Sequence, residues 1–301
     1  MFNVLEMHRM TTHNGPGFRT CVHLMGCPLS CQWCSTPESQ RQQGLGFNQE
    51  RCIACGSCVS ACTRGALTME SGAKVQLNRQ KCDECFACVS ECYSKALWKY
   101  GITYSKEELE KEILKDKIFF DKSEGGVTFS GGECLLSAGK EMQELFASLK
   151  SKGINICIDT CGHVPWENIE LLLPYIDSFL WDVKMMDPGK HSEYTGADNI
   201  QILENLQRVD MKSEADIYIR VPLIPGINDS KGEIEAICAF AKGLRHFKEL
   251  HFLPYHHLGQ NRYIFSGREF PLPGLSRQSD EKLNCILAIA KKYGLSARTV
   301  G

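Results

Sequence analysis

The sequence has no long hydrophobic run and almost no excess of charge. Its apolar stretches, such as "CILAIA" at 285–290, fall far short of the roughly 20 residues that span a bilayer. The formal net charge of −2 gives no general attraction to nucleic acid or to anionic lipid, which favour strongly basic surfaces. The opening residues, "MFNVLEMHRM", contain no apolar stretch of signal-peptide length. We therefore expect a soluble, cytoplasmic protein with neither a nucleic-acid partner nor a membrane partner.

Cysteine, in contrast, is abundant, with seventeen residues. A chain of 301 residues with 43% hydrophobic content needs no disulfide framework, and clustered thiols in a reducing compartment most often bind metal. Eleven cysteines fall into three regularly spaced groups, at 27–34, 52–62 and 82–92. The other six fit no ligand spacing, and we expect them to be non-ligands, since buried free thiols behave as small hydrophobes. These six are Cys21, Cys134, Cys157, Cys161, Cys238 and Cys285.

The two groups of four belong to an internal repeat. "CIACGSCVSACTRGAL" at 52–67 recurs as "CDECFACVSECYSKAL" at 82–97, with every cysteine displaced by thirty positions. This is the spacing of bacterial ferredoxins, in which three cysteines of one motif and the fourth of the other hold one [4Fe–4S] cluster. The rule predicts two ligand sets: Cys52, Cys55, Cys58 and Cys92, and Cys82, Cys85, Cys88 and Cys62. Structural zinc is the alternative, although zinc sites usually separate two cysteine pairs by a dozen or more residues.

The rest of the chain alternates short apolar or β-branched runs with amphipathic helical patterns. Ser105 and Glu108 form a capping box, and two apolar helical stripes end at Gly153 and Gly294. The alternation favours a parallel α/β sheet, either a partial barrel or an open doubly wound sheet, and in both architectures functional residues gather at the carboxyl ends of strands. The predicted strands are 19–25, 126–132, 154–160, 178–184, 216–224 and 249–255.

The remaining cysteine group, "CPLSCQWC" at 27–34, follows the first of these strands. Cys27, Cys31 and Cys34 are one thiolate short of a complete [4Fe–4S] ligand set, so one iron would stay open to a non-protein ligand. The alternative is a structural metal with a remote fourth ligand. Because a loop at the carboxyl end of a strand is where a barrel places its active site, we expect a bound reactant at the open iron.

The longer segment "HNGPGFRTCVHLMGCPLSCQWCSTPES" resembles the activating enzymes of glycyl radical enzymes, which belong to the radical S-adenosylmethionine (radical SAM) family with its CxxxCxxC signature. The resemblance continues through "TFSGGECLL", "IDTCGH", "WDVKMMDPGKHSEYTG", "RVPLIPGIND" and "LPYHHLG", and so covers nearly the whole chain. It implies a partial (β/α)6 TIM-like barrel of residues 1–46 and 101–301. Residues 47–100 would be an inserted bacterial ferredoxin-like 2[4Fe–4S] domain, which marks the larger members of the family.

The resemblance also implies an activity. SAM would chelate the open iron of the cluster on Cys27, Cys31 and Cys34, and one electron would cleave SAM to methionine and a 5′-deoxyadenosyl radical. That radical would remove a hydrogen from a glycine Cα of a partner glycyl radical enzyme. We therefore expect an anaerobic oxidoreductase with three [4Fe–4S] clusters, SAM and a monovalent cation, supplied with electrons by a flavodoxin- or ferredoxin-type donor.

Residues at the strand ends would bind SAM by the family pattern. Gly131 and Gly132 have no Cβ, so backbone groups there can approach a ligand's amine closely. The resemblance assigns Ser130 to Glu133 to the methionine amino group, Trp33 to the neighbourhood of the adenine, and Asp159 also to the cation. The residues that it assigns to the methionine, carboxylate or ribose of SAM are Asp159, Thr160, Asp182, Lys184, Arg220 and His256. Taken alone, the glycine pair would indicate a turn, and Asp182 with Lys184 would indicate a surface ion pair.

Two positions depart from the family pattern. Asn14 stands where the family has the Asp of "DGPG", and Cys134 stands where it has Pro after "GGE". Two other functions share some of these features: an iron–sulfur electron-transfer protein and a radical SAM peptide maturase. A pure electron carrier does not need the three-cysteine motif, and peptide maturases usually carry their extra clusters after the barrel, where this chain has only Cys285 beyond residue 238.

Overall fold

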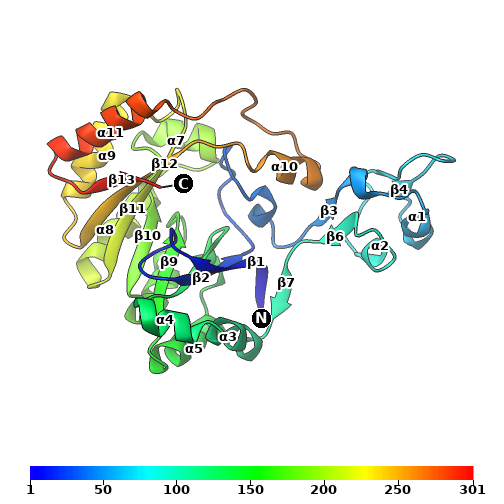
Figure 1. Ribbon diagram of the computed structural model, residues 1–301, viewed down its shortest axis with the longest axis horizontal. Helices are drawn as coiled ribbons and strands as arrows, with labels where there is room; N and C mark the ends of the chain where they lie inside the picture. Colours follow the sequence, from blue (N-terminus) through cyan, green and yellow to red (C-terminus); the bar gives the residue numbers. More distant parts are fainter. Residues whose placement is uncertain (301) are drawn as a thin grey trace.

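The computed structural model describes residues 1–300, and its main element is a nine-stranded sheet with the order β13-β12-β11-β10-β9-β8-β2-β1-β7 (Figure 1). All neighbouring pairs among the six expected strands are parallel, which confirms the prediction of a parallel α/β sheet. These strands are β2 (Arg19–Leu24), β8 (Gly126–Gly131), β9 (Asn155–Thr160), β10 (Ser178–Asp182), β11 (Asp216–Leu223) and β12 (Phe247–Pro254).

Three strands of this sheet are not apparent in the sequence. β1 (Phe2–Thr11) pairs antiparallel with β2, β7 (Ile102–Tyr104) pairs antiparallel with β1, and β13 (Ala297–Thr299) pairs parallel with β12. In β1 an Arg262 ion pair engages Glu6, and the ring of His8 lies against that of His23. In β1, polar side chains make some of the tertiary contacts. The strand therefore lacks the regular apolar alternation by which strands are predicted from sequence.

Helices connect the strands, with three of them gathered along one flank of the sheet and three below it in Figure 1. The predicted capping box is present, because Ser105 Oγ accepts from the Glu108 amide at 3.1 Å and Glu108 Oε2 accepts from the Ser105 amide at 2.8 Å. No helix within residues 1–300 is long and apolar enough to cross a membrane. The flank helices are α8 (Ile200–Lys212), α9 (Lys231–Lys242) and α11 (Asp280–Lys292), and the lower ones are α3 (Lys106–Leu114), α4 (Lys117–Ser123) and α5 (Lys140–Ser151). The other elements are α6 (Trp166–Leu172), α7 (Pro188–Thr195), α10 (Gln260–Ser266) and the 3-10 turns η1 (Pro37–Gln40), η3 (Cys134–Ser137) and η4 (Leu173–Tyr175).

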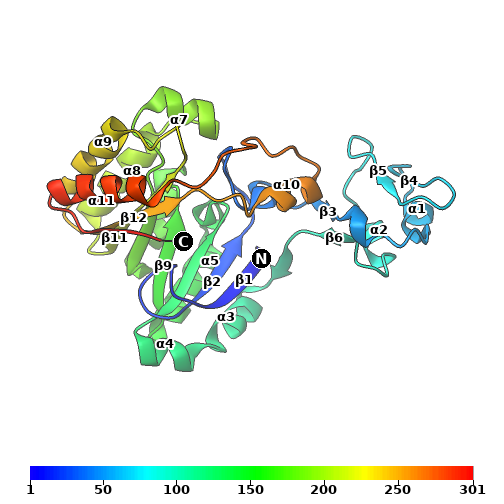
Figure 2. The same ribbon diagram turned by 45° about the horizontal axis from the view of Figure 1, so that its top comes forward.

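The segment between β2 and β7 extends away from the sheet in both Figure 1 and Figure 2. Its base is an antiparallel pair, β3 (Leu45–Phe47) with β6 (Leu97–Lys99), in which Leu45 lies opposite Lys99. The segment has its own apolar cluster, separate from the main core, which includes Leu45, Leu67, Val75 and Leu97. Its other elements are η2 (Gln49–Arg51), α1 (Ser57–Ala61), β4 (Leu67–Thr68), β5 (Gln76–Leu77) and α2 (Ala87–Ser90).

The sequence repeat in this segment is also a repeat of backbone conformation. Left-handed residues recur thirty positions apart, and four of the six are not glycine. Only glycine adopts this conformation without a steric cost, so the contacts of the folded segment must hold the other four in place. The three pairs are Ala54 and Glu84 (φ 55° and 57°), Gly56 and Phe86 (76° and 61°), and Gly65 and Lys95 (61° and 52°).

Arg19 is a fully buried arginine at the start of β2. Its Nε donates to Thr128 Oγ1 at 2.6 Å, its Nη2 to the Val127 carbonyl at 2.6 Å and its Nη1 to the Pro16 carbonyl at 3.0 Å. Thr128 in turn donates to the Asn14 carbonyl at 2.6 Å. The guanidinium therefore fastens the "NGPG" turn to β8.

Replacing Arg19 by methionine should lower the free energy of unfolding by about 3 kcal/mol, because several buried acceptors would lose their donor. Arg277→Met is the matched control, since it removes only the exposed pair with Asp280 and should change stability little. Anaerobic urea unfolding followed by circular dichroism measures both. Equal losses in the two variants would contradict the role given to Arg19.

Candidate active site

The three-cysteine loop lies where the sequence places it, at the carboxyl end of β2 and before η1. The backbone amides of Ser30 and Gln32 donate to carbonyls in the last turn of α7, at 2.7 and 3.0 Å. Within the loop, the Cys34 amide donates to the Cys31 carbonyl at 3.1 Å. Cys27, Cys31 and Cys34 are all partly buried.

The surroundings affect the three thiols differently. Burial raises the pKa of Cys31 to about 12 and also raises the pKa of Cys34. A hydrogen bond from the Cys161 thiol lowers the pKa of Cys27. The Lys184 ammonium lies close enough to favour the thiolate form of Cys31 in part. A thiol must lose its proton to bind metal, so a cation among these sulfurs would offset the cost of burying their charge.

Five of the predicted SAM-binding residues form one polar network at the ends of β8 to β11. Asp159 Oδ2 accepts from Ser130 Oγ at 2.7 Å and from Arg220 Nη1 at 2.9 Å. Lys184 Nζ donates to Asp182 Oδ2 at 2.7 Å, and Arg220 Nε lies 3.9 Å from Asp182 Oδ1. The Lys184 side chain is only 7% exposed, so its pair with Asp182 is not the surface pair that the spacing alone would suggest.

Charge balance within the network follows from this pairing. Burial raises the pKa of Asp159, while the Arg220 guanidinium lowers it. Burial alone would lower the pKa of Lys184, but the Asp182 carboxylate and neighbouring thiols raise it well above its usual value. Two acidic and two basic side chains are thus packed together, and their negative and positive charges nearly cancel.

Glu133 is fully buried and is bound by the protein itself. Its carboxylate accepts from the Thr160 hydroxyl at 2.7 Å and from the Cys161 amide at 2.9 Å. Its own amide donates to the Gly26 carbonyl at 2.7 Å. Burial raises its pKa, against these hydrogen bonds. Glu133 therefore connects the end of β8 to the end of β9 and to the base of the three-cysteine loop, and the Thr160 hydroxyl is engaged in the same connection.

The glycine pair before Glu133 has a structural reason of its own. Gly131 has a left-handed φ of 110°, and a Cβ there would collide with the Leu24 carbonyl oxygen. A Cβ on Gly132 would collide with the Gly26 carbonyl oxygen. The end of β2 thus approaches β8 too closely for any side chain, and this approach requires glycine before any ligand is considered. Contact between these glycines and a ligand stays a prediction.

Two predicted residues are not joined to the polar network. Trp33 is half-buried on the three-cysteine loop, and His256 is exposed after β12. Within residues 1–300, no side-chain hydrogen bond or ion pair connects either of them to Asp159, Lys184 or Arg220. Their assignments to the adenine and to SAM rest on the family resemblance.

Cys161 is a site residue that the sequence analysis missed, because it fits no ligand spacing. Its sulfur lies 2.9 Å from Glu133 Oε2 and also hydrogen-bonds the Cys27 sulfur. Its place directly after the strand-end pair in "IDTCGH" was the available signal. Of the other unpatterned cysteines, Cys285 is exposed on α11, unlike the buried thiols expected. The buried ones are Cys21, Cys134, Cys157, Cys161 and Cys238.

The structure also brings together two sets of four cysteines, in the grouping that the ferredoxin rule predicts. The first four-cysteine site is a small pocket whose lining includes Cys52, Cys55, Cys58 and Cys92. The second four-cysteine site is a small pocket whose lining includes Cys62, Cys82, Cys85 and Cys88. In each, the fourth cysteine comes from the other repeat.

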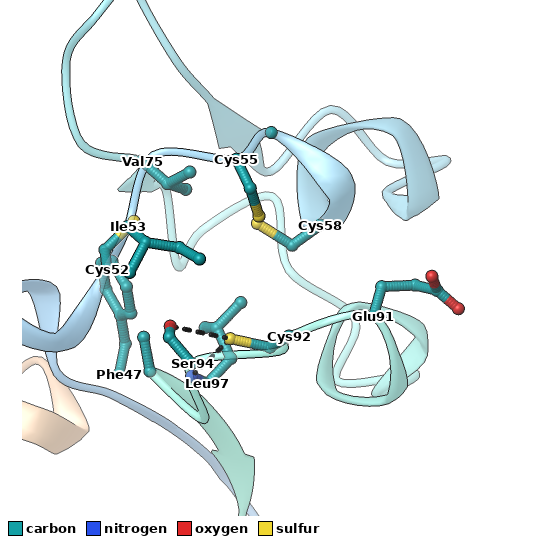
Figure 3. A pocket seen from close by; sticks show the side chains of 12 residues that line it. Phe47, Cys52, Ile53, Cys55, Cys58, Val75, Glu91, Cys92, Ser94 and Leu97 are labelled. Atoms are coloured by element: carbon teal, nitrogen blue, oxygen red, sulfur yellow. Dashed lines mark hydrogen bonds between the residues drawn. The ribbon is translucent and has the colours of Figure 1, made fainter.

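The lining of the two sites suits iron–sulfur clusters. Figure 3 shows cysteine side chains directed into the first site among apolar residues, while Glu91 points away. The Leu97 amide donates to Cys92 Sγ at 3.4 Å, and the Ala66 amide donates to Cys62 Sγ at 3.3 Å. Within residues 1–300, no group of three or more His, Cys, Asp or Glu is arranged to hold a single metal ion. Four thiols around an apolar cavity, with amides directed at sulfur, fit a [4Fe–4S] cluster.

Two family models match the chain. Residues 79–241 match the radical SAM superfamily, and residues 45–68 match a 4Fe-4S binding domain. The first match covers more than half of the chain. Together the two matches imply a [4Fe–4S] cluster and SAM as cofactors.

Similar proteins agree with this assignment. The trans-4-hydroxy-L-proline dehydratase activating enzyme of Clostridioides difficile is 39% identical over 301 residues, which cover 99% of each chain. The isethionate sulfite-lyase activating enzyme of Oleidesulfovibrio alaskensis is 36% identical over 94% of this chain and 93% of its own. A solved domain of a pyruvate-formate lyase-activating enzyme from Bacteroides vulgatus is 29% identical with a TM-score of 0.50, covering 59% of this chain and 99% of that domain. The chain therefore belongs to the radical SAM superfamily and, within it, to the activating enzymes of glycyl radical enzymes.

Proposed function

We propose that this protein activates a partner glycyl radical enzyme by creating a radical at a glycine Cα of that partner. The observation that carries the proposal is the three-cysteine loop, which is held beside a charged network at the carboxyl ends of four parallel strands. When bound, a one-electron-reduced [4Fe–4S] cluster with SAM on its open iron supplies methionine and the 5′-deoxyadenosyl radical, which takes the glycine hydrogen and becomes 5′-deoxyadenosine. Cys27, Cys31 and Cys34 are the ligands in this proposal.

The polar network at the ends of β8 to β11 is proposed to bind the methionine part of SAM. Its ammonium and carboxylate need partners of both signs, and the network offers Asp159 and Asp182 on one side and Lys184 and Arg220 on the other. Because these side chains already neutralise one another, a zwitterion can exchange partners with them without leaving a buried charge unpaired. Ser130 hydrogen-bonds Asp159, which we also propose as the contact of a monovalent cation.

The other predicted residues have supporting roles in this proposal. Gly131 and Gly132 let β2 and β8 approach closely, and Glu133 with Thr160 fixes the base of the three-cysteine loop, so these four position the site from beneath. Trp33 and His256 border the adenosine end by the family pattern.

We further propose that residues 1–46 and 101–301 form a partial (β/α)6 barrel and that residues 47–100 form a ferredoxin-like insert. The parallel order of β2 and β8 to β12 supports the first part, as does the absence of any pairing between edge strands β7 and β13 within residues 1–300. The separate apolar cluster and the two four-cysteine sites support the second. The protein would then bind three [4Fe–4S] clusters and accept electrons from a flavodoxin- or ferredoxin-type donor.

Anaerobic reconstitution should give about twelve irons per chain, since each of three clusters holds four. Replacing Cys52, Cys55 and Cys58 together by alanine should remove about four of them, because only Cys92 would remain at the first four-cysteine site. Iron analysis and absorption spectra measure the loss, and Cys238→Ala, which changes a buried thiol far from all three groups, should keep the full count. Bound zinc without charge-transfer absorption would refute the cluster assignment.

Replacing Cys31 by alanine should abolish reductive SAM cleavage, because the three-cysteine loop has no spare thiolate. The formation of 5′-deoxyadenosine under strictly anaerobic reduction is the assay. In the wild type, SAM should also perturb the electron paramagnetic resonance of one cluster, and the variant should lose this response. Cys285→Ala, at the exposed cysteine of α11, should behave like the wild type. Continued production of 5′-deoxyadenosine by Cys31→Ala would show that the proposed function is wrong.

A further inference from the structure

α10 lies between the three-cysteine loop and the segment that carries the two four-cysteine sites. At its start, Gly259 packs so closely on the loop that a Cβ would lie 3.2 Å from the Cys34 carbonyl oxygen. Tyr263, in the middle of α10, is only 3% exposed. Near its end, the Phe265 ring meets the Trp98 ring of β6 edge to face, with centroids 5.6 Å apart. One short helix therefore contacts both iron–sulfur regions.

Two arginines, Arg262 within α10 and Arg268 just after it, bind the chain that follows Cys34. Arg262 Nη1 donates to Glu38 Oε1 at 2.6 Å, and its Nη2 lies 3.1 Å from Glu6 Oε1 on β1. Arg268 Nη1 donates to Gln40 Oε1 at 2.6 Å. Glu38 and Gln40 both belong to η1, so α10 is fixed relative to the loop that carries the three cysteines.

Arg79 connects α10 to the segment that carries the two four-cysteine sites. Its Nη1 donates to the Leu45 carbonyl of β3 at 2.7 Å, and its Nη2 donates to the Phe265 carbonyl at 2.7 Å. Gly267, with a φ of +72°, follows α10 where a Cβ would collide with the Arg79 side chain. A single guanidinium thus joins two segments that are 186 residues apart in the sequence. The missing side chain of Gly267 leaves space for it.

The second four-cysteine site adjoins the contact of Arg79. Arg41, Leu45, Arg79 and Cys82 line one polar hollow, and Leu45 and Cys82 also line the second four-cysteine site. Neither Leu45 nor Cys82 lines the first four-cysteine site. In Figures 1 and 2, α1, which carries Cys58, lies farther from the sheet than α2, which carries Cys88.

We propose that Arg79 and α10 form a joint that holds the second four-cysteine site toward the three-cysteine loop. The second site is then the inner one, and the first site is the outer one. Arg79 is a positioning residue: it contacts neither SAM nor a cysteine sulfur but fixes the distance between two of the metal sites. This inference rests on the proposed function, because the distance matters only if electrons pass from the insert to the three-cysteine loop.

The repeat supplies a matched control. Gln49 stands thirty positions before Arg79, at the equivalent place in the first motif, and its Nε2 donates to the Val75 carbonyl at 3.2 Å. Gln49→Ala therefore removes a side chain that bonds only within the segment, whereas Arg79→Ala breaks the joint. Arg79→Lys keeps a cationic donor at the position and should restore part of the contact.

The first measurement is hydrogen exchange on the reconstituted protein, which needs no turnover. In Arg79→Ala, amides of residues 260–267 should exchange about tenfold faster than in the wild type, because α10 loses its charged donor. Gln49→Ala should leave these amides unchanged, and both variants should keep the wild-type iron content. Equal exchange rates of residues 260–267 in all three proteins would show that Arg79 does not hold α10 in place and that the proposed joint is wrong.

The second measurement compares electron donors. With reduced flavodoxin, Arg79→Ala should form 5′-deoxyadenosine more slowly than the wild type, Arg79→Lys should recover part of the rate, and Gln49→Ala should match the wild type. With dithionite, a small reductant that reaches the three-cysteine loop directly, all four proteins should be equal. A wild type that forms no 5′-deoxyadenosine with either donor would refute the proposed function, whereas an active wild type matched by Arg79→Ala with flavodoxin would refute the joint alone.

Discussion

The active site depends on one buried carboxylate. Glu133 takes hydrogen bonds from the end of β9 and from the first residues of η3, while its amide holds the turn before Cys27. A carboxylate shielded from water is costly unless its oxygens are bonded, and here both oxygens have partners. The same residue therefore sets the positions of three strand ends at once. Cys161 extends this arrangement, since its sulfur reaches both Glu133 and Cys27.

The polar lining of the sheet explains how the fold carries charged ligands. Parallel strands are usually apolar on both faces, because helices cover one face and the core fills the other. In β2, Arg19 and Cys21 alternate with Thr20 and Val22, and the first pair lies on the face that holds Asp159 and the other site residues. The two acidic and two basic side chains of the polar network are paired before any ligand arrives, which keeps the network ordered. The cost of burying charge is met within the protein, and in the proposed function the ammonium and carboxylate of the methionine part of SAM would together add no net charge to the network.

Much of this organisation could be predicted from the sequence because its signals are local. The six strands are short β-branched runs with clear ends, and the ferredoxin spacing is sufficient to group the eight cysteines as the structure does. What could not be predicted depends on partners far away in the chain. β1 is hidden because Glu6 meets Arg262, 256 residues later, and the role of Glu133 depends on a loop 28 residues away. The Asp182 and Lys184 pair was visible, but only burial shows that it is an interior pair.

The base of the segment between β2 and β7 shows which part of this chain could be removed as a unit. β3 and β6 are antiparallel neighbours, so the chain leaves the main sheet and returns to it at adjacent points, with Leu45 opposite Lys99. Cα atoms paired in this way are about 5 Å apart, a gap that a tight turn can close. Removing residues 47–98 as a whole would therefore leave two chain ends that a short connection can join. Half of this segment cannot be removed in the same way, since each four-cysteine site takes its fourth cysteine from the other repeat. The two four-cysteine sites are therefore structurally inseparable, because deleting either repeat would leave neither site with four cysteines.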